Sequence, residues 1–163
     1  MTPSSGEKTR VYKAGVIRSF YCISPSVNTA PIIIVDDDED DKHLLQDAWK
    51  ELGYPNPLLF LKTGEEVLHY LTAEQIIPFL ILCDVNIPKM DGFELKAKLL
   101  EDSSTKYKSI PFVFWSSNVS NKQIQKAYDL GVNGFFVKDN TFDEIKQSLI
   151  DIVNYWQKSK VPE

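Results

Sequence analysis

Short apolar runs alternate with amphipathic helical periods five times between Pro31 and Trp156. Runs of this length, rich in β-branched and aromatic residues, predict buried strands, and the segments between them predict helices. Strands that alternate with helices form a parallel sheet covered by helices on both faces. We therefore predict an α/β fold with a doubly wound, five-stranded parallel sheet and five helices. The predicted strands are residues 32–35, 58–61, 79–84, 110–115 and 134–137.

Composition excludes several classes of protein. The chain has 163 residues, 43% of them hydrophobic, which suits one domain with a real core. Its net charge of −5 argues against general nucleic-acid binding, and no apolar stretch approaches the length of a membrane span. Its cysteines, Cys22 and Cys83, have no metal-type spacing and fit a reducing compartment. We predict a cytoplasmic protein with no nucleic-acid or membrane partner.

The first 29 residues differ from the rest of the chain. They contain four basic residues against the single acidic residue Glu7, and no helical or strand period persists in them. We interpret residues 1–29 as a flexible tail, residues 30–158 as the domain and residues 159–163 as a short C-terminal tail. A targeting or docking arm is the alternative for the first segment. Nothing after Lys158 is long enough for an output domain.

Polar side chains stand where four of the predicted strands end. Asp36 and Asp37 follow the first strand, Asp84 the third, Ser116 the fourth and Lys138 the fifth. The carboxyl ends of parallel strands share one edge of a sheet, where ligands bind. Three carboxylates at one edge repel each other unless a cation joins them or some of them are protonated. A cation that prefers oxygen ligands and keeps several waters, Mg²⁺, fits such a set. With a lysine and a hydroxyl nearby, the set suits a phosphoryl group on or beside one carboxylate.

This order of residues resembles a response-regulator receiver domain of the CheY-like superfamily, over about residues 31–157. Pro88, Asp91 and Gly92 after Asp84 add to the resemblance. It implies a flavodoxin-like sheet with strand order 2-1-3-4-5. It also implies a stand-alone phosphoacceptor rather than an enzyme. Asp84 would take a phosphoryl group from a histidine kinase or a histidine phosphotransfer protein and signal through contact with a downstream protein.

The resemblance also assigns the magnesium ligands. Asp37 and Asp84 would bind Mg²⁺ through their side chains, Asn86 through its backbone carbonyl and Asp36 through water. The ion would neutralise charge as the phosphoryl group is transferred. The family has two paired acids after the first strand. Here they are assigned to Asp36 and Asp37, and the alternative pair is Asp37 and Asp38.

The remaining roles implied by the resemblance concern the phosphoryl group and the switch. Ser116 would hydrogen-bond a phosphoryl oxygen and Lys138 would pair with it. Phe135, at the family's aromatic switch position, would move inward as the Ser116 loop closes, shifting a face of the domain. Apart from the resemblance, the apolar stripe from Phe142 to Trp156 predicts a core-facing helix, whose far end is a candidate face for a homodimer or another partner.

Two residues depart from the family pattern. The family usually has proline after the lysine, with a cis peptide, whereas here Asp139 follows Lys138. A cis bond before a residue other than proline costs about 3 kcal/mol, so we expect a trans bond and a rearranged loop, with cis left open. An inward Asp139 would weaken phosphoryl binding. Ser117 stands where the family mostly has alanine, and its side chain is small enough to leave the site open to phosphate.

Two other functions compete with the phosphoacceptor. One is a receiver that binds partners constitutively without phosphorylation, which Asp139 keeps open. The other is a Mg²⁺-dependent aspartyl phosphohydrolase. Such an enzyme has a second aspartate, its acid and base, two residues after the nucleophile. This chain has Asn86 at that position and so lacks the acid and base. The acids 38–41 are interpreted as a solvated helix start rather than as part of the site.

Overall fold

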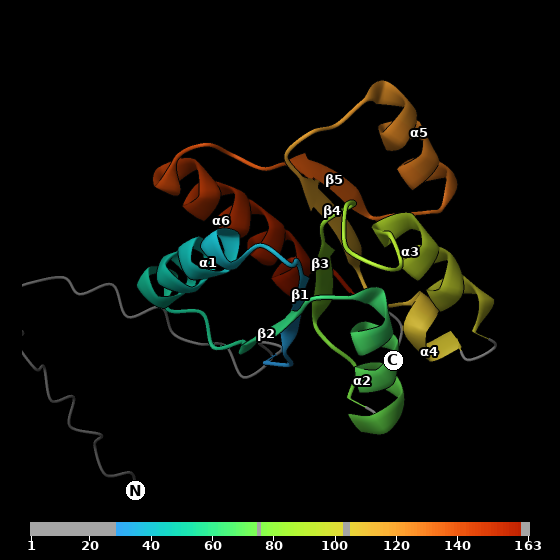
Figure 1. Cartoon of the computed structure of the whole chain (residues 1–163). Helices are drawn as coiled ribbons and strands as arrows, with labels where there is room; N and C mark the ends of the chain where they lie inside the picture. Colours follow the sequence, from blue (N-terminus) through green and yellow to red (C-terminus); the bar gives the residue numbers. More distant parts are fainter. Residues whose placement is uncertain (1–28, 75, 103–104, 161–163) are drawn as a thin grey trace, which may run out of the picture.

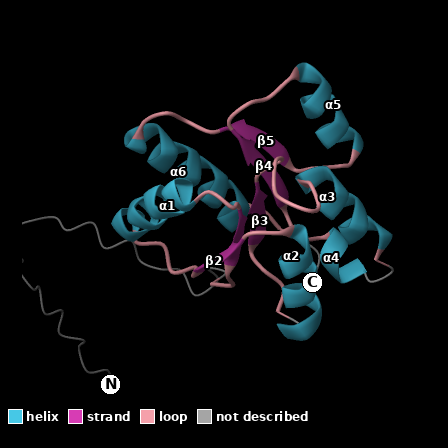
Figure 2. Cartoon of the chain, in the orientation of Figure 1, coloured by secondary structure: helices cyan, strands magenta, loops and turns pink. Residues whose placement is uncertain are grey.

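The fold is a five-stranded parallel sheet between two layers of helices (Figures 1 and 2). The computed structural model describes residues 29–74, 76–102 and 105–160. Its strand order is β2-β1-β3-β4-β5, with every neighbouring pair parallel. The predicted fold class and strand order are confirmed. The strands are β1 Ile32–Val35, β2 Leu58–Leu61, β3 Leu80–Cys83, β4 Phe112–Ser116 and β5 Gly134–Val137.

The helices divide between the two faces of the sheet. α1 and α6 pack together on one face, whereas α2, α3, α4 and α5 lie on the other side (Figure 1). Side chains alternate between the two faces along each strand, so each face presents an apolar surface for helices to cover. Their bounds are α1 Glu39–Leu52, α2 Gly64–Glu74, α3 Gly92–Glu101, α4 Thr105–Lys108, α5 Asn121–Asp129 and α6 Phe142–Lys158.

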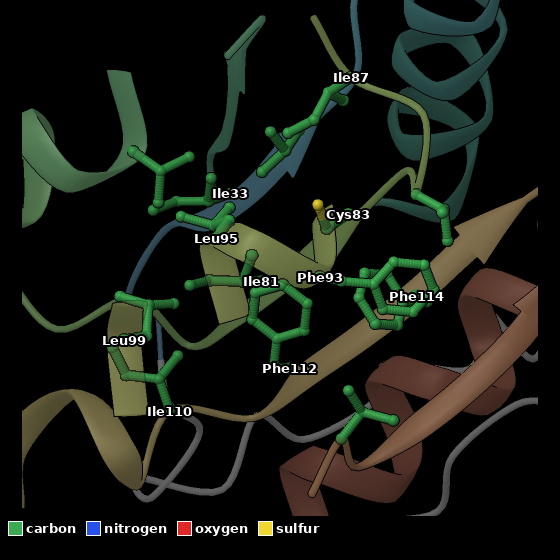
Figure 3. Packing of buried hydrophobic residues seen from close by; sticks show 14 of the residues in the cluster. Ile33, Ile81, Cys83, Ile87, Phe93, Leu95, Leu99, Ile110, Phe112 and Phe114 are labelled. Carbon is green, nitrogen blue, oxygen red and sulfur yellow. The ribbon is translucent and has the colours of Figure 1, made fainter. Parts of the chain in front are cut away.

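Alternate residues of the central strands build two separate cores. Ile33 and Ile81 face the α2 and α3 side, where they pack with a group of aromatic rings (Figure 3). Ile32 and Leu80 face α1 and α6. All four residues of β1 and of β3 are buried, as expected for strands covered on both faces. The charged residues that follow these strands are therefore fixed to a rigid support.

Three details of the elements differ from the prediction. The structure adds a sixth helix, α4, whose single turn begins at Thr105, where the sequence predicts a polar loop; residues 103 and 104 lie outside the described residues. Its Tyr107 hydroxyl donates to the Leu71 carbonyl at 2.9 Å, a tertiary contact that leaves no sequence period. β3 begins one residue later than predicted. β4 begins at Phe112, because Pro111 has no N–H for the sheet.

The predicted tails fall mostly outside the described part of the chain. Residues 1–28 and 161–163 are not described, so the boundaries at residues 29 and 158 remain predictions. Ala30 belongs to the folded part, since its carbonyl accepts a hydrogen bond from the Asn56 side chain at 2.8 Å. Within the described residues, no helix combines the length and apolar character needed to span a membrane.

Phe112 provides a test of the core on the α2 and α3 side. Its ring is 1% exposed and packs edge-on against Phe114, with ring centroids 5.2 Å apart. We expect Phe112→Ala to lower the free energy of unfolding by about 3–5 kcal/mol, because it removes a large buried ring and leaves a cavity. Denaturant unfolding measures this, with Tyr128→Ala, at a 54% exposed position, as the control. The control is expected to stay within about 0.5 kcal/mol of the parent. Equal losses in the two variants would contradict this account of the core.

Candidate functional site

Asp84 lies at the centre of the sheet edge, directly after β3. Its backbone N–H donates to the Val35 carbonyl at 2.9 Å, which joins it to the neighbouring strand. One carboxylate oxygen accepts from the Ser116 hydroxyl at 2.8 Å and from the Asn86 N–H at 3.0 Å. The other accepts from the Lys138 ammonium at 2.8 Å. The carboxylate is thus held by groups from two loops and from the end of β4.

The Lys138 ammonium joins three carboxylates at this edge. Its Nζ lies 2.6 Å from Asp36 Oδ2, 2.6 Å from Asp41 Oδ2 and 2.8 Å from Asp84 Oδ2. Asp36 also accepts from the backbone N–H of Asp38 at 2.9 Å. The structure therefore brings Asp36, Asp84 and Lys138 together as predicted, and it adds Asp41.

The placement of Asp41 corrects the interpretation of residues 38–41 as a purely solvated helix start. Asp38 is the N-cap of α1, and its side chain accepts from the N–H groups of Asp40 and Asp41. Asp41 lies four and seven residues before Leu45 and Ala48, which are buried on the inner face of α1. Residues at this spacing share one helix face, so Asp41 lies on the same face of α1 as these buried residues, at the end nearest the sheet edge. The cap and this spacing are the sequence signals that could have found it.

The cap also bears on the register of the acidic pair. The Asp38 side chain caps α1 and is therefore not available for a metal. Asp36 is the buried acid before the helix, with 8% exposure. Asp37, the next residue, is exposed at the surface beside it. This arrangement favours Asp36 and Asp37 as the pair rather than Asp37 and Asp38.

Burial and hydrogen bonding shift the pKa of each charged group in the cluster in opposite directions. Burial raises the pKa of Asp84, but hydrogen bonds from Lys138 and from the Asn86 N–H outweigh it, so the pKa is lowered overall. Burial also raises the pKa of Asp36, and there its effect exceeds that of the hydrogen bonds. Burial lowers the pKa of Lys138, yet hydrogen bonds to Asp36, Asp41 and Asp84 raise it above its usual value. Asp84 is therefore an ionised carboxylate beside a charged lysine.

A cavity of about 70 Å³ lies beside this cluster, between α1 and the start of α6. Leu44, Trp115 and Ile145 form part of its apolar side, whereas Asp41 and Lys138 line the polar side. The Trp115 indole N–H is buried and has no hydrogen-bond partner among the described residues. A cavity of this size has room for a few water molecules next to the carboxylates.

The donor set is compatible with a divalent cation. Asp36 and Asp84 already converge on one cationic atom, the Lys138 Nζ, and the Asn86 N–H fixes the loop after Asp84. Carboxylate and carbonyl oxygens are the ligands Mg²⁺ prefers. Within the described ranges, no three acidic, histidine or cysteine side chains are gathered closely enough to hold a metal ion. Binding a metal here therefore requires some rearrangement of the lysine and carboxylates.

Asp139 lines the cavity beside the cluster, and its carboxylate is bonded to α6. No peptide bond in the described residues is cis, so the Lys138–Asp139 bond is trans. The Asp139 carboxylate accepts a hydrogen bond from the Ser148 hydroxyl of α6 at 2.5 Å. The Lys138 N–H donates to the Ser116 carbonyl at 3.1 Å, which keeps the lysine in line with the sheet. The departure from proline therefore leaves the lysine in place.

Phe135, the predicted switch residue, is half-buried in β5. Its ring centroid lies 5.6 Å from that of Phe114, on the face of the sheet opposite α1 and α6. The hydroxyl of Ser116, the other predicted switch residue, donates to Asp84, and Ser116 is 1% exposed.

Comparison with known proteins identifies relatives of the whole domain. Residues 32–150 match the family model of the response regulator receiver domain. The probable methanogenesis regulatory protein FilR2 of Methanothrix harundinacea is 27% identical over 129 residues, covering 77% of this chain and 82% of that protein. The response regulator Rcp1 of Synechocystis sp. is 26% identical over 130 residues, covering 77% of this chain and 87% of Rcp1.

Solved structures agree in fold. The phosphorylated cyanobacterial phytochrome response regulator RcpA superposes with a TM-score of 0.75 at 30% identity, covering 83% of this chain and all of RcpA. The Mn²⁺-bound form of Rcp1 superposes with a TM-score of 0.71 at 26% identity, covering 82% of this chain and 99% of Rcp1. The receiver domain of the Pseudomonas aeruginosa sensor histidine kinase PA1611 has magnesium in its active-site cleft. It superposes with a TM-score of 0.65 at 18% identity, covering 81% of this chain and all of that domain. Receiver domains related in fold to this chain thus bind divalent metals.

Gly92 provides a test of the packing behind Asp84. A Cβ at this position would lie 2.6 Å from the Asp84 carbonyl oxygen and 2.7 Å from the Phe114 ring. We expect Gly92→Ala to lower the free energy of unfolding by about 1–3 kcal/mol, because the methyl group overpacks a rigid backbone. Gly134→Ala is the matched control, since its Cβ would meet only the Phe136 and Val113 side chains, at 3.4 Å or more. A Gly92→Ala chain as stable as the control in denaturant unfolding would show that this close approach is not a constraint.

Proposed function

The chain belongs to the response regulator receiver domain family, and from this premise we propose that Asp84 is its phosphoacceptor in a two-component signalling system. The observation that carries the proposal is the meeting of Asp84 with Ser116 and Lys138, each within 2.8 Å. The lowered pKa of Asp84 keeps the carboxylate ionised and available to attack. The family membership itself makes the domain a phosphoacceptor in phosphorylation-dependent signalling rather than an ordinary enzyme.

The transfer step follows from the charges at the site. A carboxylate oxygen of Asp84 forms a bond to phosphorus as the bond from phosphorus to the donor's histidine nitrogen breaks, and the electron pair leaves with the nitrogen. The Lys138 ammonium pairs with one phosphoryl oxygen, and the Ser116 hydroxyl turns from Asp84 to donate to another. These fixed charges and donors stabilise the charge that develops on the transferred group.

We assign magnesium to the acidic side of the site. Asp37 and Asp84 would hold it through their carboxylates, Asn86 through its backbone carbonyl and Asp36 through water. The Mn²⁺-bound form of Rcp1 supports this assignment, as does the oxygen-only donor set. When bound, the ion offsets charge on the carboxylates and on the phosphoryl oxygens.

The output is a change of surface that starts at Ser116. When its hydroxyl turns toward the phosphoryl group, the loop after β4 closes and Phe135, which already packs against Phe114, moves further inward. The half-buried position of Phe135 supports this role, because the ring can become more buried or more exposed at modest cost. The proposed partners are a histidine kinase or phosphotransfer protein, which supplies the group, and a downstream protein that binds the altered face. A second copy of the chain is a further candidate partner at the end of α6, and the cytoplasm is the proposed location.

The competing functions lose support. A receiver that works without phosphorylation was kept open by Asp139, but this side chain is bonded to Ser148 of α6. An aspartyl phosphohydrolase needs an acid and base two residues after the nucleophile, where this chain has Asn86.

Phosphorylation by a small donor tests the proposal directly. Intact mass is measured after incubation of the full chain with acetyl phosphate and Mg²⁺. We expect one phosphoryl adduct, which is absent when Asp84→Asn replaces the parent and absent when a chelator removes the Mg²⁺. Ser116→Ala is expected to slow adduct formation, because a donor to the phosphoryl group is lost. Ser117→Ala, an exposed hydroxyl next to it, is the matched control and is expected to behave as the parent. Equal adduct on the parent and on Asp84→Asn would contradict the assignment.

A further inference from the structure

The Lys138 ammonium has no free hydrogen-bond donor. An ammonium group carries three hydrogens, and this one lies within hydrogen-bond distance of Asp36, Asp41 and Asp84. If Lys138 pairs with a phosphoryl oxygen, one of these three contacts must be given up.

The three carboxylates differ in how well they tolerate losing the lysine. The side chains of Asp36 and Asp84 are only 5% and 12% exposed, whereas that of Asp41 is 32% exposed. A carboxylate without a partner is costly when it is buried and much less so when water reaches it. Asp36 and Asp84 also face the proposed Mg²⁺. Before transfer, while Asp84 is still a free carboxylate, Asp41 is the acid with no assigned role at the metal, so its contact costs least to exchange.

The contact with Asp41 also joins two parts of the fold. Asp41 lies in the first turn of α1, and Lys138 follows β5. β1, which leads into α1, is separated from β5 by β3 and β4 in the sheet. The ion pair therefore bridges the mouth of the site from one side to the other.

We propose that phosphorylation exchanges Asp41 for a phosphoryl oxygen on Lys138, so that Asp41 competes with the phosphoryl group before transfer and releases the first turn of α1 afterward. This inference rests on the proposed function. It adds an acid that lowers the affinity of the site for a phosphoryl group, and it gives the start of α1 a part in the response. Removing the Asp41 charge lowers repulsion of the incoming group and removes its rival for the ammonium.

Asp40 offers a matched control for this exchange. It lies in the same exposed first turn of α1 and carries the same charge, and its backbone N–H bonds to the same N-cap residue, Asp38. The ion pairs found for Lys138 are with Asp36, Asp41 and Asp84. Asp40→Asn therefore changes the charge of the helix start without removing the contact.

The affinity for beryllofluoride, a phosphoryl mimic, tests the exchange. Binding to the full chain is measured by titration at saturating Mg²⁺ for the parent, Asp41→Asn and Asp40→Asn. We expect Asp41→Asn to bind about five-fold tighter than the parent, near the upper range for a partly exposed ion pair, and Asp40→Asn to bind as the parent does. Asp41→Glu keeps the charge and is expected to bind no more tightly than the parent.

A second measurement does not depend on a variant. The side-chain carboxyl ¹³C signal of Asp41 in the parent is expected to shift toward that of the hydrated Asp40 when beryllofluoride binds. An unmoved Asp41 signal, or equal affinities of Asp41→Asn and Asp40→Asn with clear binding, would overturn the exchange alone. A folded parent that binds no beryllofluoride would overturn the proposed function together with the exchange.

Discussion

A single half-buried ammonium holds the acidic edge of this sheet together. Without Lys138, Asp36 and Asp84 would face each other at the mouth of the site, each with little access to water. The Coulomb cost of such a pair is large in a poorly solvated place, and here a cation at hydrogen-bond distance offsets it. The same lysine keeps Asp84 ionised and links it to α1 through Asp41. Stability and reactivity of the edge therefore rest on one residue, which the proposed metal and phosphoryl group would have to share.

The geometry around this lysine is set by elements that carry no charge. β1 and β3 are buried on both faces, so the residues that follow them have little freedom to move. Gly92 lets the chain after Asp84 return close to the Asp84 carbonyl. Asp38 starts α1 just past the acidic pair, which turns Asp41 inward. A site that must bind a small, highly charged group benefits from this rigid support.

Much of this arrangement could be predicted from sequence because it depends on short-range patterns. The β-branched run 32–35 and the apolar run before Asp84 predict buried strands, and the residues after them share an edge in any parallel sheet. The strand order came from the family resemblance, because five strands can be ordered in several ways. α4 was missed, since a single turn leaves no period. Asp41 was missed because four neighbouring acids look alike until the cap fixes the helix register. The direction of Asp139 depended on a contact with Ser148, nine residues away.

Asp84, alone among the acids at this edge, is the proposed site of phosphorylation. Borohydride reduction of the chain after treatment with acetyl phosphate and Mg²⁺ converts an aspartyl phosphate to homoserine, and peptide mass mapping locates the converted position. The account predicts homoserine at position 84 and unmodified aspartate at positions 36, 37 and 41. Homoserine at one of these other positions, or at none in a folded and fully treated sample, would contradict it.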